Sequence, residues 1–145
     1  MKAIEYLRQI KTMDAKINTD IEELASLEAL ATKTTSVLGD ERVQSSGSQQ
    51  KMADAVVKIA DLRNNINEQI DRFVDYKEEV KNLLFESCDS DCIKLLHKRY
   101  FMDKKWEEIA VEMNYTYQWV QGGLHQRALS QVQKALDERG GGNVS

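Results

Sequence analysis

No proline occurs anywhere in this chain of 145 residues. Proline is the strongest helix breaker, and β-proteins normally separate their strands with more glycine and proline than this chain contains. The seven glycines are confined to Gly39, Gly47, Gly122, Gly123 and the run 140–142. The long glycine-free stretches between them predict an all-α protein.

Two long stripes of apolar residues recur at steps of three and four in the first 88 residues. Such spacing is typical of amphipathic helices, and a narrow stripe indicates a coiled-coil-like seam. The first stripe comprises Ile4, Leu7, Ile10, Met13, Ile17, Ile21, Leu24, Leu27 and Ala31. The second comprises Met52, Val56, Ile59, Leu62, Ile66, Ile70, Phe73, Lys77, Val80 and Leu84.

The segment between the stripes, Gly39 to Gln50, is polar and predicts a loop. Two stripes of nearly equal length on either side of a loop favour an antiparallel helical hairpin over residues 1–88. Because two helices cover little core by themselves, we expect the hairpin to form a homodimer or a higher homo-oligomer. The alternative is that the hairpin folds back on the C-terminal part of the chain.

Residues 89–138 carry signals for three shorter helices. Asp89 or Ser90 is a suitable N-cap for a helix over Asp91 to Tyr100, and a short helix is expected from Lys105 to Met113. The turn Asn114-Tyr115-Thr116 follows, with Asn114 suited to left-handed backbone and Thr116 to an N-cap. The last helix is expected from Tyr117 to about Glu138, and residues 139–145 are expected to be a disordered tail. Its expected inner face comprises Val120, Leu124, Ala128, Val132 and Leu136.

A helix of about nine residues, a three-residue turn and a longer helix is the plan of the helix-turn-helix. The stretch from Trp106 to Leu129 resembles region four of bacterial sigma factors, through Trp106-Glu107-Glu108-Ile109-Ala110, Thr116 and Ala128-Leu129. The resemblance covers about 45 residues, counting the supporting segment IKLLHKRYF. One departure is that the spacing from Leu124 to Ala128 is one residue longer than the usual arrangement.

The whole chain also resembles small proteins from phages and prophages of Gram-positive bacteria, a likeness that extends to RVQSSGSQQKMADAVVKIADL. This resemblance, to the ArpU and RinA groups, implies a late-gene transcriptional regulator that binds double-stranded DNA, with RNA polymerase as a candidate further partner. Two alternatives stay open. One is the DNA-recognition (small) subunit of a phage packaging machine, and the other is a helical module that binds protein and not DNA.

In a helix-turn-helix the N-terminal residues of the second helix reach base edges in the major groove. The expected DNA-binding residues on and before that helix are Thr116, Tyr117, Gln118, Gln121, Gly122 and His125. The expected phosphate-binding residues are Lys98, Arg99, Lys104 and Lys105. The alternative for both groups is an ordinary solvated face. The pair Gly122-Gly123 inside a helix indicates either a close approach of the backbone or a locally weak helix.

Charge is the main observation against DNA binding. The net charge is −4, and residues 89–145 hold as many acidic as basic side chains, whereas most DNA-binding domains have a basic patch. No catalytic constellation occurs, so we expect no enzyme. The only cysteines, Cys88 and Cys92, lack a good fourth zinc ligand, so no metal or cofactor is expected. Without a signal peptide or an apolar run long enough for a membrane span, a cytoplasmic location is predicted. The resemblance to phage proteins implies that the cell is a bacterial host.

Overall fold

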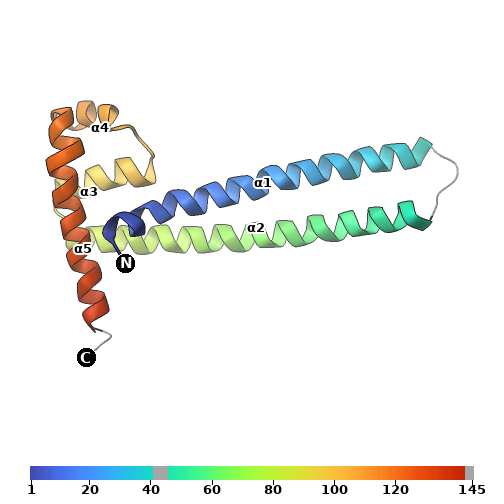
Figure 1. Cartoon of the computed structure of the whole chain (residues 1–145), viewed down its shortest axis with the longest axis horizontal. Coiled ribbons are helices and arrows are strands. Elements are labelled where there is room, and N and C mark those ends of the chain that lie inside the picture. Colours follow the sequence, from blue (N-terminus) through green and yellow to red (C-terminus); the bar gives the residue numbers. More distant parts are fainter. Residues whose placement is uncertain (41–45, 143–145) are drawn as a thin grey trace. The chain divides into compact units, whose positions relative to one another are not determined.

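The structure, a computed structural model, describes residues 1–40 and 46–142. All regular secondary structure in these residues is helical, so the all-α prediction is confirmed (Figure 1). The elements are α1 Ala3–Asp40, α2 Ser46–Ser87, α3 Ser90–Leu96, the π-helical η1 His97–Phe101, α4 Trp106–Met113, the π-helical η2 Trp119–Leu124 and α5 His125–Gly142.

Two boundaries predicted from composition were wrong. The loop predicted at Gly39 to Gln50 is helical at both ends, because α1 continues to Asp40 and α2 begins at Ser46; residues 41–45 lie outside the described part. The predicted tail is helical up to Gly142, and residues 143–145 are likewise outside it. A helix that is already nucleated gains one hydrogen bond for each residue added, which offsets the modest cost of a glycine.

The chain divides into two compact units, and the division differs from the predicted boundary near residue 88. One unit is Asp14–Arg72, and the other joins Met1–Met13 to Phe73–Ser145. The ends of both long helices therefore belong to the same unit as the C-terminal helices. This corresponds to the alternative in which part of the hairpin folds back on the C-terminal part.

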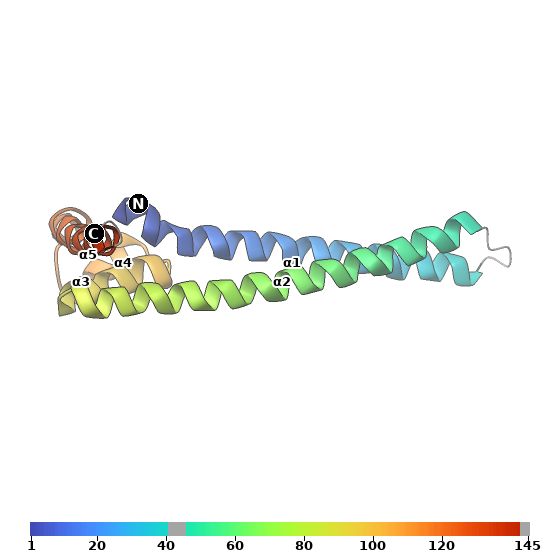
Figure 2. The same cartoon turned by 90° about the horizontal axis from the view of Figure 1, so that it is seen from below.

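Within unit Asp14–Arg72, α1 and α2 lie side by side and run in opposite directions (Figures 1 and 2). Their contact is a seam spaced by threes and fours, as in a coiled coil. On α1 the half-buried or buried seam residues are Ile17, Asp20, Leu24, Leu27 and Ala31. On α2 they are Met52, Ala55, Ile59, Leu62, Ile66 and Gln69.

Polar pairs fix the register of this seam. The amide Nε2 of Gln69 donates to Oδ2 of Asp20 at 2.6 Å, and Arg63 pairs with Glu28 across the same two helices. A polar partner within an apolar seam opposes sliding, because any other register would leave it unpaired. Val56 and Ile70, which the sequence pattern assigned to the seam, are instead exposed.

The core of the other unit is built from the ends of the long helices and the C-terminal helices. Leu7 of α1, Leu84 of α2, Leu96 of α3, Ile109 of α4 and Leu124 of η2 belong to one buried cluster. The N-terminus is tied to α5, since the backbone N–H of Ala3 donates to Oε1 of Gln133 at 2.8 Å. In the part of the chain that the structure describes, no helix is both long enough and apolar enough to cross a membrane.

Candidate nucleic-acid interface

The turn that joins α4 to the following helix has the geometry that its residue types predict. Asn114 adopts left-handed backbone with φ 59° and ψ 40°, and it ends α4. The hydroxyl oxygen of Thr116 accepts from the backbone N–H of Trp119 at 3.2 Å, which caps the next helix. The predicted roles of Asn114 and Thr116 in the turn are therefore confirmed.

The helix that begins at Tyr117, which we call the recognition helix, comprises η2 and α5 with the two residues before them. Its inner face is as predicted at Val120, Leu124, Ala128 and Val132, which are all buried, and Leu136 is half-buried. On its outer face Tyr117, Gln118 and Gln121 are exposed, as is Thr116 before it. Gly122 is half-buried. These residues are accessible from outside the unit.

His125 was predicted on this outer face, and that prediction was wrong. Its ring is half-buried, its Nε2 lies 2.8 Å from the hydroxyl oxygen of Tyr100, and it packs edge-on against Trp106 with ring centroids 4.7 Å apart. Burial lowers the pKa of His125 to about 4, so the ring is neutral at pH 7.

The reason for this difference is the π-helical stretch Trp119–Leu124. A π-helical turn contains more residues than an α-helical turn, so every side chain after it is rotated relative to the α-helical expectation. Leu124 and Ala128 both remain in the core, so the additional residue noted between them leaves the buried face of the helix intact.

The two adjacent glycines of this stretch differ in their surroundings. A Cβ atom at Gly123 would lie 2.3 Å from Cζ3 of Trp119, whereas one at Gly122 would meet nothing within 4 Å. The indole of Trp119 therefore lies against the helix where Gly123 has no side chain, and it stays 42% exposed. The close approach of the Trp119 side chain, from the same helix, therefore explains why residue 123 is a glycine.

Three of the four predicted phosphate-binding side chains are engaged within the protein. The ammonium groups of Lys98 and Lys104 each lie 2.7 Å from Oε1 of Glu112. These two lysines lower the pKa of the Glu112 carboxyl. The guanidinium of Arg99 donates to the backbone oxygen of Lys104 at 3.0 Å and lies 4.5 Å from the ring centroid of Trp106. Lys105, the residue before α4, is exposed.

Sequence reasoning missed an exposed apolar surface beside the turn. Val111 is 77% exposed, and it lines a shallow groove with Glu107, Ala110, Tyr115 and Tyr117. The hydroxyl of Tyr115 donates to Oδ2 of Asp91 at 2.6 Å, which fixes one wall of the groove. The only sequence signal was Val111 itself, an apolar residue outside the inward pattern of α4.

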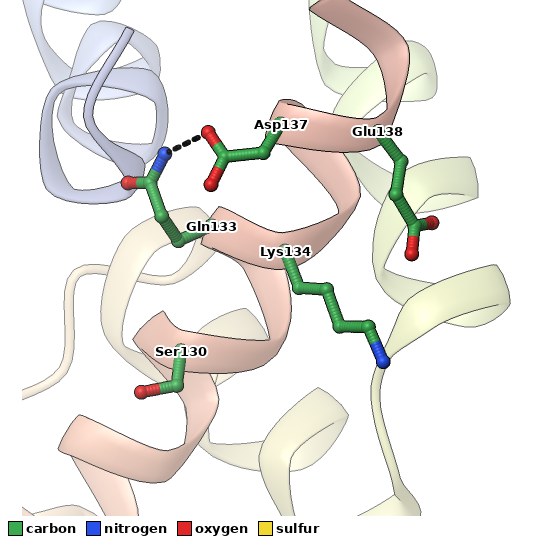
Figure 3. A pocket seen from close by; sticks show the side chains of 5 residues that line it. All are labelled: Ser130, Gln133, Lys134, Asp137 and Glu138. Carbon is green, nitrogen blue, oxygen red and sulfur yellow. Dashed lines mark hydrogen bonds between the residues drawn. The ribbon is translucent and has the colours of Figure 1, made fainter. Parts of the chain in front are cut away.

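The surface of α5 carries a hollow whose residues take part in the fold. The hollow is lined by Ser130, Gln133, Lys134, Asp137 and Glu138, and in it Nε2 of Gln133 donates to Oδ1 of Asp137 at 3.1 Å (Figure 3). The same Gln133 holds the N-terminus, so its amide is already used in the fold.

The cysteines lie beside the N-cap of α3. Asp89 accepts from the backbone N–H of Cys92 at 3.0 Å, which confirms the predicted cap. Both thiols are free, and burial raises the pKa of Cys92 to about 12. Among the described residues, no group of three or more His, Cys, Asp or Glu side chains is placed to hold a metal ion.

Comparison of the chain with protein-family models, with curated proteins and with solved structures finds no match.

Proposed function

We propose that this protein is a sequence-specific DNA-binding regulator of transcription, of the type found in phages and prophages, and that it acts in the bacterial cytoplasm. The observation that carries the proposal is the pairing of α4 with the recognition helix. A capped three-residue turn joins them, and the recognition helix buries Val120 and Leu124 while leaving Gln118 and Gln121 exposed. This is the arrangement that presents the start of a helix to the major groove.

Affinity for DNA without regard to sequence is expected to be poor. Phosphate contacts supply most of such affinity, and Lys98 and Lys104 are held by Glu112. Lys105 is exposed and available for a phosphate. Specific binding would then need two recognition helices acting together, which a homodimer formed through α1 and α2 would supply. RNA polymerase stays a candidate partner.

A second candidate function is a protein-interaction module. The observation that favours it is the apolar groove beside Val111, because exposed apolar surface of this kind often marks a protein contact. A third candidate function is that of the small subunit of a phage packaging machine, which would combine DNA recognition with helical oligomerisation.

The test is selection of bound sequences from a random duplex pool, with binding then measured at several salt concentrations. Gln118→Ala and Gln121→Ala should change the preferred sequence and cost about 1–3 kcal/mol at the selected site. Lys105→Ala should weaken binding to all duplexes alike and lower the salt slope by about one unit.

Gln50→Ala is the matched control. Gln50 is an exposed glutamine of unit Asp14–Arg72, and its replacement should leave DNA binding unchanged. Absence of any duplex preference at low salt would rule out DNA reading and leave the interaction module.

A further inference from the structure

The first observation is a gap in the charge pattern of the sequence. From Met113 to Gln126 there is no Asp, Glu, Lys or Arg. This stretch includes the turn and the first turns of the recognition helix. Recognition of guanine in the major groove normally uses Arg or Lys, and recognition of cytosine uses a carboxylate. Neither type of side chain is available on this part of the helix.

The cationic groups nearest in the fold do not fill this gap. His125 is neutral and hydrogen-bonded with Tyr100. Arg127, the first charged residue after the gap, has its Nη2 atom 2.6 Å from Oδ2 of Asp89. Arg99 lies over Trp106, and Lys98 and Lys104 are paired with Glu112. These cationic groups are therefore engaged within the protein, and the charged side chain that lies beside Tyr117 in the groove is the carboxylate of Glu107, from α4.

What this surface does offer is two primary amides. Gln118 and Gln121 are both exposed and lie within the first five residues of the recognition helix. A glutamine amide has a donor and an acceptor side by side, which match N7 and the N6 amino group of adenine.

It also offers exposed aromatic rings of defined position. Trp119 and Tyr117 are each 42% exposed. The indole of Trp119 packs against the backbone of Gly123, which has no side chain. This contact fixes the position of the ring on the helix surface. Apolar side chains recognise thymine in the major groove through its C5-methyl group.

We infer that the recognition helix reads A·T base pairs, with Gln118 and Gln121 pairing with adenine and Trp119 contacting the thymine methyl group. The inference rests on the proposed DNA-binding function and adds to it the class of sequence that is bound. A half-site contacted by this helix should consist mainly of A·T pairs. Guanine and cytosine are disfavoured because this part of the helix carries neither the Arg or Lys that normally recognises guanine nor the carboxylate that recognises cytosine.

The test changes single groups on the DNA, so that it does not depend on the folding of a variant. Duplexes recovered from the random pool are remade with deoxyuridine at each thymine in turn, which removes only the C5-methyl group. At one or two positions affinity should fall by about fourfold, the value expected for one methyl group buried from water. Replacing adenine by 7-deazaadenine removes the N7 acceptor and should weaken binding by about tenfold at contacted positions.

Variants then assign each effect to a side chain. In Trp119→Ala the effect of deoxyuridine should disappear, while the effect of 7-deazaadenine should remain. In Gln118→Ala or Gln121→Ala the reverse is expected at the adenine that each one contacts.

Two results would overturn the inference, and they differ in what else they imply. Selected half-sites rich in G·C pairs, or no loss of affinity with deoxyuridine at any position, would refute the A·T assignment and leave the DNA-binding function intact. No duplex preference in the pool would refute both.

Discussion

The hydroxyl oxygen of Tyr100 lies 2.8 Å from Nε2 of His125, which joins the π-helical element η1 to the first residue of α5. Trp106 covers the same imidazole from α4. Three helical elements therefore meet at one neutral histidine, and the burial that keeps it neutral links the stability of the unit to pH.

We predict a loss of stability in mild acid. The pKa of His125 is about 4 in the folded chain against 6.5 for an ordinary histidine. Between these values the unfolded chain binds a proton that the folded chain does not, so stability is complete above about pH 6.5 and falls as the pH is lowered towards 4. Because solvent reaches part of the ring, the expected loss is about 1–2 kcal/mol.

Denaturant unfolding of the full chain at pH 7 and pH 5 measures this loss. His125→Gln should flatten the dependence in that range. His97→Gln is the control: His97 is the other histidine and is exposed, and partial desolvation together with the charges of Lys98 and Lys81 lowers its pKa. This variant should flatten the pH dependence less than His125→Gln. An equal flattening by both variants would contradict the assignment to His125.

The two adjacent glycines should respond in different ways to alanine. Gly122→Ala meets open space and should stabilise the protein by about 0.5–1 kcal/mol, the usual gain in a helix. Gly123→Ala places a Cβ atom within the ring of Trp119, so the indole must move. We expect altered tryptophan fluorescence and a smaller gain or a net loss of stability. Measured in the Trp106→Phe background, the fluorescence would report Trp119 alone; identical spectra for the two alanine variants would argue against the contact.

Glu112 is predicted to limit non-specific binding to DNA. Glu112→Gln removes the carboxylate charge that Lys98 and Lys104 share, and both ammonium groups become available to phosphates. Affinity for unrelated duplexes should rise at low salt, and the salt slope should steepen by about 0.9 for each new phosphate contact. Glu108→Gln, an exposed change of equal charge on the same helix, should have a smaller effect. Equal effects would indicate that only net charge matters.

Self-association should depend on one side of unit Asp14–Arg72. Ile21 and Ile70 directly follow the hydrogen-bonded pair Asp20 and Gln69, and they are 44% and 38% exposed. In antiparallel helices the residue after each seam position turns to the same side, so both isoleucines lie on one face. Ile21→Glu with Ile70→Glu should shift sedimentation equilibrium of the full chain towards monomer. Lys58→Glu, at an exposed site on α2, should leave the association unchanged, and an unaffected double variant would place the contact elsewhere.

Local signals in the sequence identified several features of the fold. The cap at Asp89, the left-handed Asn114 and the cap at Thr116 depend on one residue and its immediate neighbours, so they were predictable. The buried face at Val120 and Leu124 followed from helical spacing alone.

Other features depend on contacts that residue type does not encode. Val56 and Ile70 are apolar, yet the seam takes Ala55 and Gln69 in their place, because the register of α2 against α1 decides which side faces inward. The inward turn of His125 depends on a π-helical stretch that changes the helical period. The partner of Lys98 is a carboxylate 14 residues away, which no local pattern reveals.

The bond between Ala3 and Gln133 joins residues separated by 130 positions, which has a consequence for folding during synthesis. The first turns of α1 leave the ribosome before the side chains that share a cluster with Leu7 in the second half of the described chain. Protein synthesis adds roughly 5–20 residues per second, so the apolar face of these turns stays exposed for on the order of ten seconds. A nascent chain stalled before residue 73 would lack every cluster member from α2 and the C-terminal helices, and would therefore present Leu7 and Ile10 to chaperones, whereas the folded chain buries both.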